Sequence, residues 1–309
     1  MDVNALRVVG KPRYRKITSG RTKFIPTGIP FLGDTLNDLE TGTVTIFGGC
    51  PGDGKSTIVH RIALEAIDHG FKAMVVDGEH RQEILINNLY TKIVGYDKEN
   101  YTNSRYNKMY IKEPKKHVVE ALEKWHKDNL IIYSKHEATE IKTLDELFDM
   151  MIYYVQELKV ELLVLDNLMS LISGNTEDLL KDQSLFMKRA TVLAKKYNVA
   201  IVLVTHPNKT VQRGEEFEYY QIAGNSDIVN LADNVVIVWR EFDVHKEADG
   251  YIAVKKNRQY GKLGKKQLTY ISQTSTLAQF ENGRAMINKI DFYPKGDQEG
   301  WEKTESTPY

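Results

Sequence analysis

The sequence predicts an α/β protein whose mainly parallel sheet is covered by helices on both faces. Five short runs rich in Val, Ile and Leu have the length and composition of buried strands. Amphipathic segments with helical spacing separate most of these runs, and a glycine-rich segment joins the first run to the first helix. Strands that are apolar throughout and alternate with helices are typical of a parallel sheet with two buried faces.

Each predicted strand is bounded by turn or polar residues. The strands are Thr43–Phe47, Ala73–Val76, Leu162–Leu165, Ala200–Val204 and Val235–Trp239. Apolar residues at helical spacing predict helices between them, because one face of a surface helix packs on the core. These helices are Lys55–Gly70, Leu144–Leu158 and Gln183–Tyr197.

Two further runs, Tyr251–Lys255 and Gln267–Ile271, have strand character and flank a turn that contains glycine. They predict a C-terminal β-hairpin. The charged, tyrosine-rich stretch Tyr96–Asn129 predicts a helical excursion from the core.

Composition narrows the class of protein. The chain has 309 residues, with 42 Lys and Arg against 42 Asp and Glu, which argues against a polycation that coats nucleic acid. The single cysteine, Cys50, excludes an intrachain disulfide and a cysteine-based zinc site. We find no run of about 18 apolar residues and no secretory signal. We therefore expect a cytoplasmic protein without a membrane partner, in a bacterial or phage-infected cell or in the mitochondrial matrix.

The distribution of charge predicts three parts. They are a basic N-terminal arm over residues 1–25, a central folded domain over residues 26–281 and a polar, mildly acidic tail over residues 282–309. The tail is expected to be solvated. Contact with phosphates and plain solvation are both consistent with the basic arm.

The segment Gly49-Cys-Pro-Gly-Asp-Gly-Lys-Ser56 matches the phosphate-binding pattern G-x-x-x-x-G-K-[ST] in full, between a predicted strand and a helix. Glycines let backbone N–H groups converge on phosphates, and the helix N-terminus adds partial positive charge. Lys55 is expected to reach the β- and γ-phosphates, Ser56 to hold Mg²⁺, and Thr57 to contact the α-phosphate. The predicted nucleotide-binding residues here are Gly49, Pro51, Gly52, Asp53, Gly54, Lys55, Ser56 and Thr57.

Leu162-Leu-Val-Leu-Asp166 predicts the second half of this site. A strand that ends in an acid delivers a carboxylate to the same edge of the sheet, so Asp166 is the second predicted metal residue. Hydrolysis also needs a base or an orienting group for water. Asp77, Glu79 and Glu83 follow the second strand, and Glu79 is the best placed.

From Ile25 to about Ile271 the chain resembles the RecA-like domain of the DnaB and Twinkle group of replicative ring helicases, most closely the phage and mitochondrial primase-helicases. Five segments carry the resemblance in the family's order. They are Ile25-Pro-Thr-Gly28 with Leu39-Glu-Thr-Gly42, Gly78-Glu79, Leu165-Asp166-Asn167-Leu168, Val204-Thr-His-Pro-Asn-Lys209, and Lys256-Asn-Arg258 with Gly261 and Gly264.

The resemblance implies roles for six residues. Glu79 would polarise the attacking water, and His206 would sense the γ-phosphate. Lys256 and Arg258 would reach the nucleotide of the neighbouring subunit, where an arginine finger is typically worth 10³–10⁵ in rate. Arg240 and Tyr270 resemble positions that sandwich the base. The alternative for Arg258 is a solvated residue in a basic hairpin, and for His206 a packed histidine at a strand end.

The polar stretch Asn208–Gln221 carries Lys209 and Arg213 and projects from the predicted active edge of the sheet, so we expect it to contact the backbone of single-stranded DNA. The segment that follows resembles the family's Arg-Gly-Ser-Gly motif, whose backbone amides hold phosphates. Ala223 replaces the usual arginine, which leaves Gly224, Asn225 and Ser226 as the predicted contacts. A surface loop without DNA contact is the alternative.

The sequence therefore predicts a hexameric helicase that couples hydrolysis of ATP, dTTP or another NTP, with Mg²⁺, to 5′-to-3′ translocation on single-stranded DNA. The implied partners are single-stranded DNA, further copies of the chain, and a primase, polymerase or loader. Asp2-Val-Asn-Ala-Leu6 resembles the segment that closes the primase fold in fused members, so the chain is either the helicase half of a longer protein or a stand-alone helicase. A recombinase filament and a RecA-fold ATPase without a DNA role remain alternatives.

Overall fold

The computed structural model describes residues 22–106, 109–135, 143–172, 179–242 and 248–292. Most of the predicted basic arm and the end of the predicted tail lie outside these residues. No helix in the described ranges is long and apolar enough to cross a membrane.

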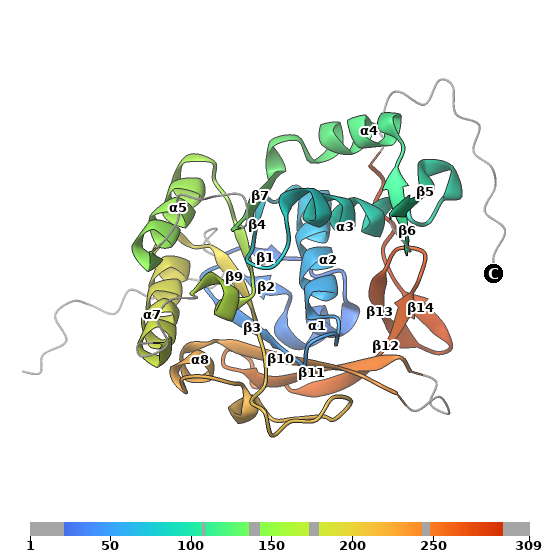
Figure 1. Cartoon of the computed structure of the whole chain (residues 1–309). Coiled ribbons are helices and arrows are strands. Elements are labelled where there is room, and N and C mark those ends of the chain that lie inside the picture. The colour runs from blue at the N-terminus through green and yellow to red at the C-terminus, as the bar shows by residue number, and fades with distance from the viewer. Residues whose placement is uncertain (1–21, 107–108, 136–142, 173–178, 243–247, 293–309) are drawn as a thin grey trace, which may run out of the picture.

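A ten-stranded sheet forms the centre of the molecule, in the order β14-β13-β12-β11-β10-β3-β9-β8-β4-β7 (Figure 1). The six strands from β10 to β7 are parallel. They are β10 (Asn234–Arg240), β3 (Val44–Gly48), β9 (Ala200–Thr205), β8 (Leu162–Asp166), β4 (Ala73–Asp77) and β7 (Leu130–Ser134). The five predicted buried strands are confirmed, and β7 is an additional edge strand.

The remaining four strands extend the sheet by antiparallel pairing. They are β11 (Gly250–Asn257), β12 (Gly264–Ile271), β13 (Thr276–Glu281) and β14 (Arg284–Met286). The predicted hairpin is confirmed as β11 and β12. Strand β14 and the buried side chains of Ile290 and Phe292 lie beyond residue 281. The boundary there remains a proposal.

Helices cover both faces of the sheet, and each face has its own apolar core. One face carries α1 (Pro30–Leu36), α2 (Lys55–Asp68), α3 (Gln82–Val94) and α4 (Lys116–His126). The other face carries α5 (Leu144–Glu157), α6 (Leu168–Leu171), α7 (Leu179–Tyr197) and α8 (Asp227–Leu231). The predicted α/β class with helices on both faces is confirmed.

The prediction of a helical excursion over Tyr96–Asn129 was wrong in part. It holds a β-hairpin, β5 (Tyr101–Tyr106) and β6 (Met109–Pro114), before α4, so it is not wholly helical. Tyrosine and β-branched residues favour strands, a signal that the high charge of this stretch obscured. A second small antiparallel pair, β1 (Phe24–Ile25) and β2 (Leu39–Glu40), precedes β3 in the chain.

Candidate active site

The phosphate-binding loop (P-loop) between β3 and α2 is tightly folded because glycine occupies its closest positions. A Cβ at Gly49 would lie 2.5 Å from the Val238 carbonyl oxygen, so only glycine lets the loop pass there. Gly54 caps α2 with φ of 88°, a left-handed conformation that favours glycine. The N–H groups of the first turn of α2 therefore open toward the loop.

Two side chains brace the loop from inside. The buried Asp53 carboxylate accepts hydrogen bonds from the N–H groups of Cys50 (2.7 Å) and Arg240 (3.4 Å). The Lys55 amino group donates to the Cys50 carbonyl at 2.9 Å. Burial lowers the pKa of Lys55, which Asp53 and Asp166 partly offset. Lys55 is therefore poorly hydrated, and its present acceptor is a neutral carbonyl oxygen. An anionic phosphate oxygen would be a stronger acceptor for its amino group.

Carboxylates meet at the carboxyl ends of β4 and β8. Asp77 and Asp166 are paired in register and both are buried. Burial acts to raise the pKa of Asp166, but the neighbouring His60 ring, the Ser56 hydroxyl and the charge of Lys55 outweigh it, so that the pKa is lowered. Asp166 is accordingly ionised at neutral pH.

The Asp166 Oδ2 atom has no hydrogen bond of normal geometry among the described residues, and His60 Nε2 faces it at 3.4 Å. His60, Asp77 and Asp166 offer ligand atoms within 4.8 Å of one another. An ionised, unsatisfied carboxylate next to the Ser56 hydroxyl is a hard oxygen donor set of the kind that Mg²⁺ prefers.

Glu79, Asn167 and His206 form a chain of hydrogen bonds across three strand ends. The Asn167 Nδ2 group donates to Glu79 Oε1 and lies 3.2 Å from His206 Nε2, and His206 Nδ1 lies 3.4 Å from the Gly49 carbonyl. Asp77 fixes the start of this chain by accepting the Glu79 N–H at 2.7 Å. A histidine that donates from Nδ1 and accepts at Nε2 is neutral. Burial, followed by the charge of Lys55, lowers the pKa of His206 and favours that form.

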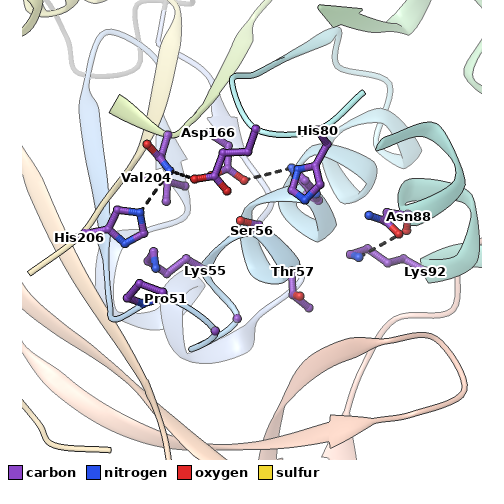
Figure 2. A pocket seen from close by; sticks show the side chains of 15 residues that line it. Pro51, Lys55, Ser56, Thr57, His80, Asn88, Lys92, Asp166, Val204 and His206 are labelled. Carbon is purple, nitrogen blue, oxygen red and sulfur yellow. Dashed lines mark hydrogen bonds and ion pairs between the residues drawn. The ribbon is translucent and has the colours of Figure 1, made fainter. Parts of the chain in front are cut away.

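These groups surround a cavity of about 420 Å³, shown in Figure 2. Its lining includes the predicted residues Pro51, Gly52, Gly54, Lys55, Ser56, Thr57, Glu79, Asp166 and His206. The structure thus brings together most of the predicted phosphate, metal and water-activating residues from four separate segments. An acid in reach of a cavity that also holds a lysine and a metal donor set can support attack of water on a phosphoryl group.

The sequence assigned no role in this site to five polar or charged residues that line the cavity: His60, His80, Asn88, Lys92 and Asn167. Asn167 directly follows Asp166, and its amide takes the place of a second acid by linking Glu79 to His206. His80 Nδ1 lies 3.0 Å from Asp77 Oδ2, and this bond raises the pKa of His80. Asn167 belongs to the segment Leu165–Leu168, whereas the other four belong to no spacing pattern, so only the packing of α2, α3 and the strand ends identifies them.

Lys256 and Arg258, the two predicted cations of the β11–β12 hairpin, lie outside this cavity. The Lys256 amino group donates to the carbonyls of Val229 (2.6 Å), Asn230 (3.2 Å) and Ala232 (2.8 Å) at the end of α8. Arg258 donates to the Asn230 carbonyl at 2.5 Å and lies 3.4 Å from the Asp233 carboxylate. Neither residue lines the cavity of its own chain. Their predicted action on a neighbouring subunit stays a prediction.

The predicted base-binding residues also lie outside the cavity lining. Arg240 is exposed at the end of β10, with its N–H directed to Asp53. Tyr270 on β12 is 45% exposed, and its N–H donates to Asp249 at 2.6 Å. Both side chains are accessible to a base, and their role in holding it stays a prediction.

Of the residues predicted to contact DNA, some are exposed and others make contacts within the chain. Lys209 is exposed, whereas Arg213 lies over the Phe242 ring at 5.0 Å and beside the P-loop, where a Cβ at Gly52 would meet its guanidinium at 2.6 Å. The Asn225 N–H already donates to Gln183 at 2.7 Å.

Gly224 also packs against the Gln183 side chain, and Ser226 precedes α8. Of the three amides predicted to hold phosphates, that of Asn225 is occupied within the chain. The DNA contacts of the other predicted residues stay predictions.

Fold and site together define a P-loop NTPase of the RecA-like class. A family model described as DnaB-like helicase C terminal domain matches residues 24–282. The chain belongs to this family and is an NTP-driven DNA helicase domain, as the resemblance implied. Members of the family are NTPases that need a divalent metal.

Two solved structures are similar to this chain, both at 14% identity and a TM-score of 0.68, and each covers 84% of it. One is described as an ATPase domain, of which 92% is covered. The other is described as the structure of a DnaB-like replicative helicase and its interactions with primase, and the match covers 62% of that chain. No curated protein sequence matches the chain. At this identity the structural similarity establishes the fold alone.

Proposed function

We propose that the chain is the motor domain of a replicative helicase that assembles as a hexameric ring and translocates 5′ to 3′ on single-stranded DNA. The observation that carries this proposal is the division of the site. Lys55, Ser56, Asp166, Glu79 and His206 converge on one cavity, whereas Lys256 and Arg258 belong to the same family pattern and lie outside it. A site divided in this way would be completed by a neighbouring copy.

Within one subunit, each group has a distinct task. Lys55 would bind the β- and γ-phosphates, and Glu79 would accept a proton from the attacking water while Asn167 holds its carboxylate in place. The neutral His206 ring would contact the γ-phosphate. Loss of this phosphate would change the position of His206 and of the stretch Asn208–Gln221 that follows β9. Ser56 and Asp166 would hold Mg²⁺, which supplies positive charge against the transferred phosphoryl group.

The nucleotide is proposed to be ATP, with dTTP as a further substrate. Single-stranded DNA would contact Lys209 and the polar stretch around it, on the edge of the sheet that carries the site. A primase is the proposed protein partner, since a primase is named in the description of one structure that the chain resembles. A polymerase or loader would be further partners.

Unwinding of a forked duplex tests the proposal directly. Substrates would carry a 5′ tail only, a 3′ tail only or both, with Lys55→Ala as the inactive control. We expect strand separation to need the 5′ tail and hydrolysable nucleotide, and electron microscopy to show closed six-membered rings. Long helical filaments on DNA would instead indicate a recombinase. Hydrolysis indifferent to single-stranded DNA, with no unwinding, would contradict the motor function.

A further inference from the structure

Among the described residues, Lys92 is a buried cation without a matching anion, at the α3 end of the nucleotide cavity. It is 4% exposed and lines the cavity together with Thr57 and Asn88. The hydrogen bond recorded for its amino group is a long one, 3.4 Å to the Asn88 carbonyl. Figure 2 shows the amino group directed toward Thr57 on α2. Burying a lysine that loses its hydration and gains one weak hydrogen bond costs folding free energy, so stability of the fold does not explain its position.

The surroundings increase this positive character. Arg61, one helical turn beyond Thr57, is 3% exposed, and its NH1 group has no hydrogen bond among the described residues. The acid nearby, Glu65, already accepts from Arg61 at 3.1 Å and from Asn288 at 2.7 Å. Burial and then the charge of Arg61 lower the pKa of Lys92 to about 8, so the amine is still mostly protonated at pH 7. This end of the cavity therefore carries positive charge that no anion among the described residues balances.

We propose that Lys92, Thr57 and Asn88 form a second phosphate subsite, which binds the α-phosphate of the nucleotide. The inference rests on the proposed binding of nucleoside triphosphate in this cavity. Lys55 lies in the P-loop, where the β- and γ-phosphates are expected. Thr57 follows the metal residue Ser56 and leads away from that point along α2. A phosphate between Thr57 and Lys92 would give the lysine the charged acceptor that the fold lacks.

The subsite has a specific signature in nucleotide affinity. ATP and ADP both carry an α-phosphate, so loss of the Lys92 charge should weaken both by the same factor. A cation that acts on the γ-phosphate would affect ATP alone. A subsite for a separate phosphate ion would leave both nucleotide affinities unchanged.

The test is equilibrium binding of Mg-ATP and Mg-ADP to the full chain with Lys92→Met, which keeps most of the apolar stem. Lys124→Met, an exposed lysine on α4, is the matched control. We expect both nucleotides to bind roughly 10- to 100-fold more weakly to Lys92→Met, the usual effect of one charge-assisted hydrogen bond, and unchanged affinity in the control. Thr57→Val should weaken both nucleotides by a smaller equal factor.

Several outcomes would overturn the subsite. One is a folded Lys92→Met variant that binds both nucleotides as the wild type does, even if binding of inorganic phosphate weakens. Another is a loss confined to ATP. If Lys92→Met does not fold, unchanged affinities in Thr57→Val overturn the proposal in its place. Wild-type protein that binds neither nucleotide would overturn the proposed function as well, so the two failures are distinguishable.

Discussion

The strand-end cluster around Lys55 and the hairpin end with Lys256 and Arg258 both contain cations that the family pattern assigns to the nucleotide, but the chain assembles the two regions differently. Lys55 is 5% exposed and lies among Asp166, Glu79 and His206. The Arg258 side chain is 46% exposed and is bonded to the carbonyl end of α8 and to Asp233. Parallel strands of one sheet necessarily deliver their end residues to one edge, whereas a hairpin at the rim presents its side chains to another surface. A single chain therefore fixes the first group, whereas the second takes part in the site only under the proposed assembly with a neighbouring copy.

The largest expected effect comes from Arg258→Ala. If the hairpin completes a neighbouring site, hydrolysis should fall by about 10³–10⁵, with nucleotide affinity little changed. Steady-state hydrolysis in the presence of single-stranded DNA measures this. Arg284→Ala, an exposed arginine on β14, serves as the control.

Mixing Arg258→Ala with Lys55→Ala subunits sharpens the same comparison. Some interfaces then pair an intact P-loop with an intact arginine, so part of the activity should return. If no mixture regains activity, Arg258 does not act between subunits.

Glu79→Gln tests the strand-end cluster with the next largest effect. The amide keeps an oxygen for Asn167 but cannot take a proton, so hydrolysis should fall by about 10²–10⁴. Binding of Mg-ATP should stay within a few-fold of wild type. Glu83→Gln, an exposed acid in the first turn of α3, should hydrolyse normally. Equal losses in the two variants would remove Glu79 from the role of base.

The same contrast explains how much the sequence could predict. The five core strands and the hairpin follow from apolar patterning, and the P-loop follows from the conformational needs of glycine at Gly49 and Gly54. Convergence of Asp166 with Lys55 follows from parallel topology. Lys92 and His60 could not be predicted, because their place in the cavity depends on how α2 and α3 pack. For the same reason the sequence did not show that the guanidinium of Arg213, a predicted DNA contact, lies beside the P-loop.

A smaller effect is expected from pH, through His206. Its lowered pKa means that the folded state takes up a proton less readily than the unfolded state. Below the ordinary pKa of about 6.5, the unfolded state binds more protons, so stability falls as pH falls, by at most about 1.4 kcal/mol per pH unit. His206→Gln removes this dependence. Urea unfolding of both proteins between about pH 5 and 7 should therefore show the stability of the wild type falling relative to that of His206→Gln as pH falls. Parallel curves would show that His206 is not held neutral.

The smallest expected effect concerns what the hairpin does for its own chain. Lys256 donates to three carbonyls at the end of α8, where carbonyls lack partners within the helix, and it shares the carbonyl of Asn230 with Arg258. Lys256→Met should therefore lower the free energy of unfolding by about 1 kcal/mol, measured in urea at a protein concentration too low for rings. Lys124→Met on α4 is the control and should change stability little. Unchanged stability would mean that the contact with α8 contributes nothing within the subunit. A loss of stability with normal hydrolysis would instead restrict Lys256 to this structural contact and leave Arg258 as the hairpin residue that acts on a neighbour.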